Sequence, residues 1–127
     1  MTVAGRGVIV VEDDPGVQRS LARLLRLAGF QPRLYGCADE LQAAPLPEAA
    51  CMIVDIQLPG ESGLALVERL LDAGPLPPVI FITASDDPEF REWAARLGAG
   101  YLNKPFHAAQ LMEMLRVMSP PKVRVSG

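Results

Sequence analysis

Short, almost purely apolar runs and helical repeats alternate along this chain. The apolar runs occupy residues 7–11, 50–54 and 79–82, and they are rich in β-branched side chains. Each is too short for a helix and shows no polar alternation, which is typical of a strand covered on both faces. Residues 31–35 and 100–103 are weaker strand candidates. The pattern therefore predicts five short strands, three of them fully buried.

Between these runs, apolar residues recur with the period of an α-helix. Such repeats cover residues 17–28, 64–71, 90–97 and 111–118, and the first of them stops at Gly29. Strands that alternate with helices indicate an α/β protein, in which a parallel sheet carries helices on both faces. In such open sheets, ligands bind beyond the carboxyl ends of the strands.

The composition is that of one domain and excludes several classes of protein. The chain has 127 residues, of which 50% are hydrophobic and 21% charged, and its mean hydropathy is +0.20. These values exclude a disordered chain, and no apolar run approaches the ~20 residues that a membrane helix needs. The N-terminus lacks an apolar stretch of signal-peptide length, so we expect a cytoplasmic protein. A net charge of −3 has the wrong sign for nucleic-acid binding by this domain alone.

Polar residues follow the predicted strands at the edge where a ligand is expected. Glu12 and Asp13 follow the first strand, Asp55 ends the third, Thr83 ends the fourth, and Lys104 follows the fifth. Three carboxylates brought together repel each other unless a cation intervenes, and Mg²⁺ prefers such oxygen ligands. The ammonium and the hydroxyl suit the oxygens of a phosphoryl group. The pattern predicts a phosphoryl-transfer site with Asp55 as the nucleophile.

Four segments together resemble the receiver domains of two-component response regulators, and most closely the FixJ subgroup. They are VIVVEDD (8–14), MIVDIQLPGESGLAL (52–66), PVIFITAS (78–85) and GAGYLNKPF (98–106). The resemblance implies a five-stranded parallel sheet of order 2-1-3-4-5 with helices on both faces, the CheY-like (βα)5 version of the flavodoxin-like fold. We expect residues 1–118 to form the receiver domain, and 119–127 to be a linker or C-terminal tail.

The resemblance also assigns a role to each residue at the strand ends. It implies that Asp55 is the phosphoacceptor, and that Glu12, Asp13, Asp55 and the backbone carbonyl of Gln57 hold Mg²⁺. Glu12 is one methylene longer than the commoner aspartate, so it reaches the metal directly or through water. Lys104 is expected to pair with the phosphoryl group.

A switch that responds to the phosphoryl group is implied as well. Thr83 is expected to move toward that group, and Tyr101 to turn between outward and inward positions. The peptide bond between Lys104 and Pro105 is expected to be cis. The face formed by the fourth helix, the fifth strand and the fifth helix would then be remodelled.

The same resemblance implies which partners the protein has. The phosphodonor would be a sensor histidine kinase or a histidine phosphotransfer protein, and a phosphorylation-dependent homodimer is a further candidate. Catalysis would extend at most to phosphorylation and dephosphorylation of the protein's own aspartate, so we do not expect a conventional enzyme. The response would control a transcriptional output domain outside these 127 residues.

Three alternative functions fit the residues less well. A haloacid-dehalogenase-like phosphatase needs a second acid two residues after its nucleophile, where this chain has Gln57. A flavodoxin-like mononucleotide binder needs a phosphate loop rich in small polar residues after the first strand, where this chain has acidic residues that repel phosphate. A receiver-like domain that is never phosphorylated is disfavoured because no site residue is missing.

Several other residues allow a structural and a functional interpretation. Asp14 is expected to cap the first helix, and the single histidine, His107, to be a solvated residue at a helix start. Trp93 either joins the core or marks a protein-contact patch. A row of arginines on the first helix is either a solvated face or a docking stripe for an acidic kinase surface. These are Arg19, Arg23 and Arg26, and the cysteines Cys37 and Cys51 are expected to be ordinary small apolar residues.

Overall fold

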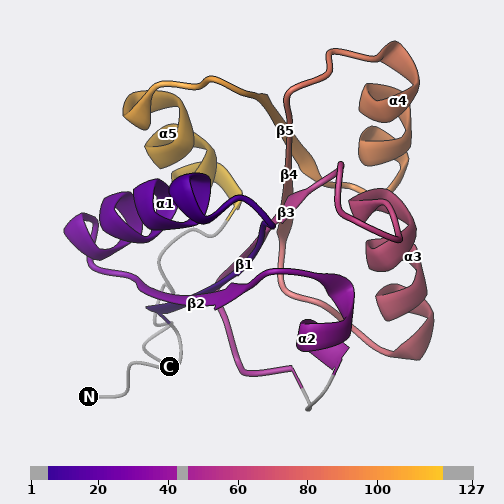
Figure 1. Cartoon of the computed structure of the whole chain (residues 1–127), viewed down its shortest axis with the longest axis horizontal. Helices are drawn as coiled ribbons and strands as arrows, with labels where there is room; N and C mark the ends of the chain where they lie inside the picture. The colour runs from indigo at the N-terminus through magenta and orange to yellow at the C-terminus, as the bar shows by residue number, and fades with distance from the viewer. Residues whose placement is uncertain (1–5, 43–45, 119–127) are drawn as a thin grey trace, which may run out of the picture.

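Five parallel strands form one sheet of order β2-β1-β3-β4-β5 in the computed structural model, which describes residues 6–42 and 46–118 (Figure 1). The predicted α/β class and strand order are confirmed. The strands are β1 Gly7–Val11, β2 Gln31–Tyr35, β3 Cys51–Asp55, β4 Val79–Thr83 and β5 Gly100–Asn103. The tail predicted at residues 119–127 lies outside the described residues.

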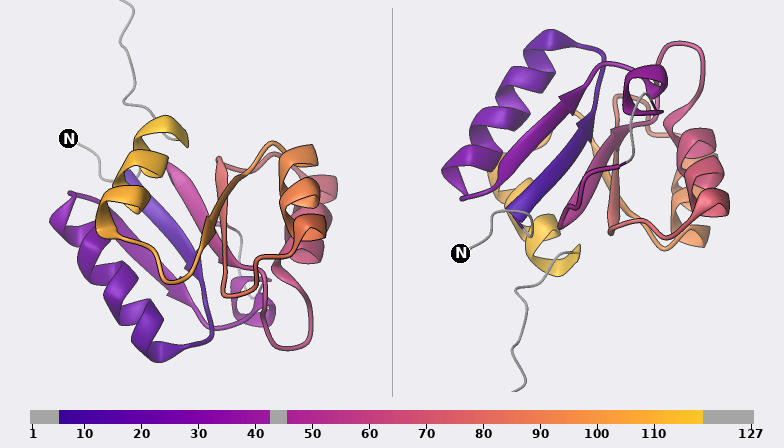
Figure 2. Two further views of the ribbon diagram at one scale, coloured as in Figure 1. Left: turned by 90° about the horizontal axis from the view of Figure 1, so that it is seen from above. Right: turned by 90° about the horizontal axis from the view of Figure 1, so that it is seen from below.

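Helices cover both faces of this sheet, as Figures 1 and 2 show: α1 and α5 lie on one face, and α2, α3 and α4 on the other. Within the described residues, no helix is both long and apolar enough to cross a membrane. The helices are α1 Pro15–Leu27, α2 Ala38–Gln42, α3 Gly63–Ala73, α4 Pro88–Arg96 and α5 Ala108–Met118.

Two hydrophobic cores explain why the central strands lack polar alternation. In β1, Val8 and Val10 pack into the core beneath α1 and α5, whereas Ile9 and Val11 pack into the core beneath α2, α3 and α4. All four side chains have no exposed surface. Because successive side chains of a strand point to opposite faces, a sheet covered on both sides must be apolar at every position.

Some predicted boundaries are wrong by one to three residues. The third strand begins at Cys51, one residue after the start of the predicted apolar run at 50. Asp55 and Thr83 end β3 and β4 as predicted, because these residues still pair in the parallel ladder. The last helix begins at Ala108, ahead of the apolar repeat at 111–118, because its first residues are exposed and carry no apolar signal.

The start of each long helix is close to a strand end, and two starts matter for the site. Asp14 caps α1, as predicted: its carboxylate accepts hydrogen bonds from the N–H groups of Gly16 and Val17. The first residue of α3, Gly63, packs against β3, and its N–H donates to the carbonyl of Ile56 at 2.8 Å. A Cβ on Gly63 would lie 2.2 Å from the carbonyl oxygen of Asp55. Only glycine permits this close approach.

Candidate functional site

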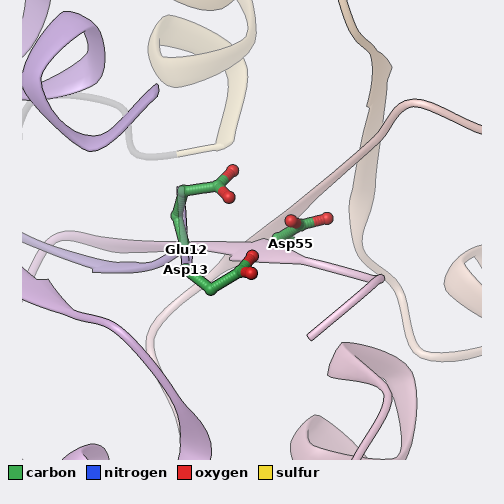
Figure 3. A group of neighbouring side chains, drawn as sticks. All are labelled: Glu12, Asp13 and Asp55. Atoms are coloured by element: carbon green, nitrogen blue, oxygen red, sulfur yellow. The ribbon is translucent and has the colours of Figure 1, made fainter. Parts of the chain in front are cut away.

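Three carboxylates gather at the carboxyl ends of β1 and β3 (Figure 3). Glu12 and Asp13 directly follow β1, and Asp55 is the last residue of β3. One carboxylate oxygen from each residue lies within 4.8 Å of the other two. Glu12 and Asp55 are buried, and Asp13 is exposed. Three hard oxygen donors at this spacing, one of them open to solvent, fit a small divalent cation such as Mg²⁺.

Lys104 bridges two of these carboxylates from the end of β5. Its Nζ lies 2.8 Å from Oε1 of Glu12 and 3.3 Å from Oδ2 of Asp55. Burial disfavours the charged ammonium, but the contacts with Glu12 and Asp55 outweigh burial and raise the pKa of Lys104. Burial also raises the pKa of Glu12, although the hydrogen bond from Lys104 opposes this shift. The ammonium thus offsets part of the repulsion within the acidic cluster.

Backbone and side-chain donors fix the orientation of the two buried carboxylates. Asp55 Oδ1 accepts a hydrogen bond from the N–H of Gln57 at 3.0 Å, which leaves Oδ2 for Lys104. Glu12 Oε2 accepts from the N–H of Asp14 at 3.1 Å, and the carbonyl of Glu12 accepts from Gln18 at 2.6 Å. The buried carboxylates are therefore held in place before any ligand binds.

Thr83 links the acidic cluster to the connection that follows β4. Its side chain is fully buried, and its hydroxyl donates to Oε1 of Gln57 at 3.4 Å. The hydroxyl oxygen of Thr83 in turn accepts a hydrogen bond from the N–H of Ser85 at 3.0 Å. The hydroxyl of Tyr101 donates to the carbonyl of Ser85 at 3.2 Å. Thr83 and Tyr101 are thus connected through one residue.

The Lys104–Pro105 peptide bond is cis, and the N–H of Lys104 donates to the carbonyl of Thr83 at 2.7 Å. Beside Lys104, a groove of about 680 Å³ runs along α1. Its apolar lining includes Val17, Leu24 and Phe106. A mainly apolar surface therefore begins directly at the polar site.

The remaining sequence candidates lie apart from this cluster. His107 is exposed just before α5, where its N–H donates to Oε1 of Gln110 at 2.7 Å. Trp93 is partly buried and packs against the core beneath α2, α3 and α4. Cys51 is buried among apolar residues, and burial raises the pKa of its thiol to about 12, so it is not a reactive thiol.

The sequence interpretation missed several residues that bear on the site. Gln18 could have been suspected, because it lies on the first turns of the helix that follows Glu12. No comparable sequence signal marks Ser85, Asn103 or Arg91. Their hydrogen bonds depend on how α4 and the β4–α4 connection pack against β5. Lys104, Glu12 and Asp55 were all predicted as site residues, but the ion pairs that Lys104 forms with the two carboxylates were not.

Comparison with known proteins gives consistent matches. A family model described as the response regulator receiver domain matches residues 8–116. Nodulation protein W of Bradyrhizobium diazoefficiens is 36% identical over 108 residues, which are 84% of this chain and 48% of that protein. The transcriptional regulatory protein FixJ of Azorhizobium caulinodans is 34% identical over 111 residues, which are 86% of this chain and 53% of that protein.

A solved structure agrees with these matches. The crystal structure of a response regulator receiver protein from Burkholderia phymatum is 40% identical and covers 91% of this chain and 98% of its own, with a TM-score of 0.74. The chain spans about half the length of the two curated relatives above. These matches favour the receiver interpretation over a phosphatase or a mononucleotide binder. The chain therefore belongs to the response regulator receiver domain family, whose members act in two-component signal transduction.

Proposed function

We propose that this receiver domain accepts a phosphoryl group on the carboxylate of Asp55 from the phosphohistidine of a sensor histidine kinase or a histidine phosphotransfer protein. One observation carries the proposal: the buried Asp55 meets Glu12, Asp13 and Lys104 at the ends of three different strands. A carboxylate in a cluster of this kind is oriented and partly neutralised in advance.

The transfer forms one bond and breaks another. An oxygen of the Asp55 carboxylate attacks phosphorus in line, the P–N bond of the phosphohistidine breaks, and its electron pair stays on the imidazole nitrogen. The hydrogen bond from Gln57 to Oδ1 orients the nucleophile. Lys104 lies 3.3 Å from Oδ2, so it can move to an oxygen of the incoming phosphoryl group.

The acidic cluster suits a resident Mg²⁺. Glu12, Asp13 and Asp55 would hold it, with the backbone carbonyl of Gln57 as a further ligand. The bound cation supplies positive charge that neutralises the phosphoryl oxygens. Thr83 supplies a hydroxyl at the same edge. A phosphoryl oxygen would compete with Oε1 of Gln57 for the hydrogen bond that this hydroxyl donates.

The surroundings of Asp55 support a protein phosphodonor. The groove along α1 offers apolar surface next to the reacting carboxylate, where a helix of the donor protein can pack. FixJ of Azorhizobium caulinodans is named a transcriptional regulatory protein, and this chain spans about half of its length, so we infer that the switch controls a transcriptional output domain in the cytoplasm. The face formed by α4, β5 and α5 is the proposed contact of a phosphorylation-dependent homodimer.

Phosphorylation by a small donor tests the proposal without a partner protein. Incubation with acetyl phosphate and Mg²⁺ should add one phosphoryl group to the wild-type protein, which intact-mass spectrometry detects. Asp55→Asn should abolish this mass increase, because an amide oxygen is a poor nucleophile. Asp72→Asn, which changes an exposed carboxylate on α3, should leave it intact. Full phosphorylation of the Asp55→Asn variant would refute the proposal.

A further inference from the structure

Arg91 of α4 joins three segments of the chain. Its Nε donates to Oδ1 of Asp86 at 2.8 Å, and its Nη2 donates to Oδ1 of Asn103 at 2.7 Å. Its guanidinium carbon also lies 4.6 Å from the centre of the Tyr101 ring. Asp86 belongs to the β4–α4 connection, whereas Tyr101 and Asn103 belong to β5. A single side chain therefore holds a helix, a connection and a strand together.

The shape of the guanidinium makes these contacts dependent on one another. Its donors are fixed in one plane, so the same orientation that stacks on the Tyr101 ring directs Nε and Nη2 to their two acceptors. Because arginine can only donate, it also fixes the Asn103 amide with its oxygen toward the guanidinium. The nitrogen Nδ2 of Asn103 is then buried without a hydrogen-bond partner within the described residues. The hydrogen bond from Arg91 therefore determines which end of the Asn103 amide faces α4.

Hydrogen bonds connect this arrangement to the phosphoacceptor. The Tyr101 hydroxyl donates to the carbonyl of Ser85, and the N–H of Ser85 donates to the Thr83 hydroxyl oxygen. The Thr83 hydroxyl donates to the side-chain oxygen Oε1 of Gln57, and the backbone N–H of Gln57 donates to Oδ1 of Asp55. An unbroken series of contacts therefore runs from Asp55 to the ring beneath Arg91.

A second connection passes through the backbone of β5. Asn103 immediately precedes Lys104, whose N–H donates to the carbonyl of Thr83. By holding the Asn103 amide, Arg91 acts next to the residue that presents its ammonium to Glu12 and Asp55. Both connections start at residues that the proposed function places around the phosphoryl group.

Arg91 differs in this respect from the other arginine of α4. Among the residues that the structure describes, Arg96 pairs only with Glu92, one turn away on the same helix, at 3.4 Å. Exposed ion pairs of that kind contribute little to stability and connect no separate elements. Arg96 is therefore a matched control on the same helix.

We propose that Arg91 is a positioning residue that transmits a change at Asp55 to α4, because it holds the Tyr101 ring and the Asn103 amide at the same time. The inference rests on the proposed function and deepens it. A phosphoryl group that draws the Thr83 hydroxyl toward Asp55 alters the hydrogen bonds of Ser85, and with them the support of the Tyr101 ring. Arg91 passes the displacement of the ring to its own helix. Without Arg91, the ring moves and α4 does not follow.

Trp93 provides a readout on the same helix. It is the only tryptophan of the chain, so its indole N–H gives a single signal in a ¹H–¹⁵N spectrum. The phosphoryl analogue beryllofluoride, added with Mg²⁺, should shift both this signal and the amide signal of Gln57 in the wild type. In Arg91→Ala the Gln57 signal should still shift, while the Trp93 shift should fall to less than half.

Two further variants separate this role from a merely structural one. Arg91→Lys keeps the charge but not the planar fork, and it should restore only part of the Trp93 shift. Arg96→Ala should respond like the wild type. A full Trp93 shift in Arg91→Ala, or no Trp93 shift in a wild type whose Gln57 signal moves, would overturn the inference. An unmoved Gln57 signal in the wild type would instead count against the proposed function.

A measurement without any ligand tests the contact itself. The single variants Arg91→Ala and Tyr101→Leu and their double variant form a cycle of unfolding constants in urea. We expect the combined effect to differ from the product of the single effects by about twofold or more, because the two side chains are in direct contact. Independent effects would overturn the inference whatever happens at Asp55.

Discussion

Replacing Lys104 with methionine removes the one cation that contacts both buried carboxylates, within the part of the chain that the structure describes. Breaking a buried ion pair by removing one partner costs about 3–5 kcal/mol, because the other charge is left uncompensated. Lys104 keeps a side-chain exposure of 20%, and methionine preserves most of its apolar stem. We therefore expect Lys104→Met to lower the free energy of unfolding by about 3 kcal/mol at alkaline pH, the lower end of that range.

The loss should depend on pH with a definite sign. Burial already raises the pKa of Glu12 above 4.5, and the hydrogen bond from Lys104 opposes that shift. Without Lys104 the pKa of Glu12 rises further in the folded state, so the folded state binds a proton more tightly than the unfolded chain. The free energy of unfolding then falls as pH rises from 4.5 through the folded pKa. Because Glu12 of the variant binds its proton more readily at low pH, the loss should be smaller at about pH 5 than at about pH 8.

Urea unfolding followed by circular dichroism at these two pH values measures the effect. Arg96→Ala, which breaks an exposed ion pair, should change stability little at either pH. If Lys104→Met were as stable as the wild type at pH 8, or if its loss were the same at both pH values, the assigned role of the buried ion pair would be wrong.

Two further variants test the packing and the metal site. Gly63→Ala should destabilise the protein by about 2 kcal/mol or more in thermal unfolding, because its Cβ would collide with the Asp55 carbonyl oxygen at 2.2 Å. Gly74→Ala, whose Cβ meets no atom within 4 Å, is the control, and equal melting temperatures for the two variants would contradict the argument. Mg²⁺ at a hundred times its dissociation constant should stabilise the wild type by about 2.7 kcal/mol. Asp13→Asn should lose most of this response, whereas Asp14→Asn should keep it, because asparagine still caps α1. Retention of the full Mg²⁺ response in Asp13→Asn would exclude Asp13 as a ligand.

Sequence reasoning found the acidic cluster because its position depends on a rule of topology. Glu12, Asp13 and Asp55 follow buried parallel strands, and the carboxyl ends of such strands meet at one edge of the sheet. The same rule brought Thr83 and Lys104 to that edge. Helix boundaries were less certain, because exposed first turns such as that of α5 carry no apolar repeat.

Other interactions depended on side-chain packing between elements. The sequence left open whether Trp93 is buried or exposed. The structure packs it against a core, where its Nε1 has no hydrogen-bond partner among residues 6–42 and 46–118. Nothing in the pattern around Arg91 distinguishes it from Arg96, since both are exposed arginines on one helix. Only Arg91 lies close enough to Tyr101 and Asn103 to contact them.

By itself, the sequence determined the order of strands and helices along the chain, the burial of the sheet on both faces, and which chemical groups lie at the carboxyl ends of its strands. Hydrophobic periodicity and the chain direction of parallel strands are enough to specify these features. The tertiary structure decided which of those groups are in contact: that Lys104 binds Glu12 as well as Asp55, and that Arg91 holds Tyr101. Such contacts depend on differences of a few ångströms in how separate elements pack, and no pattern along a single chain encodes distances of that size.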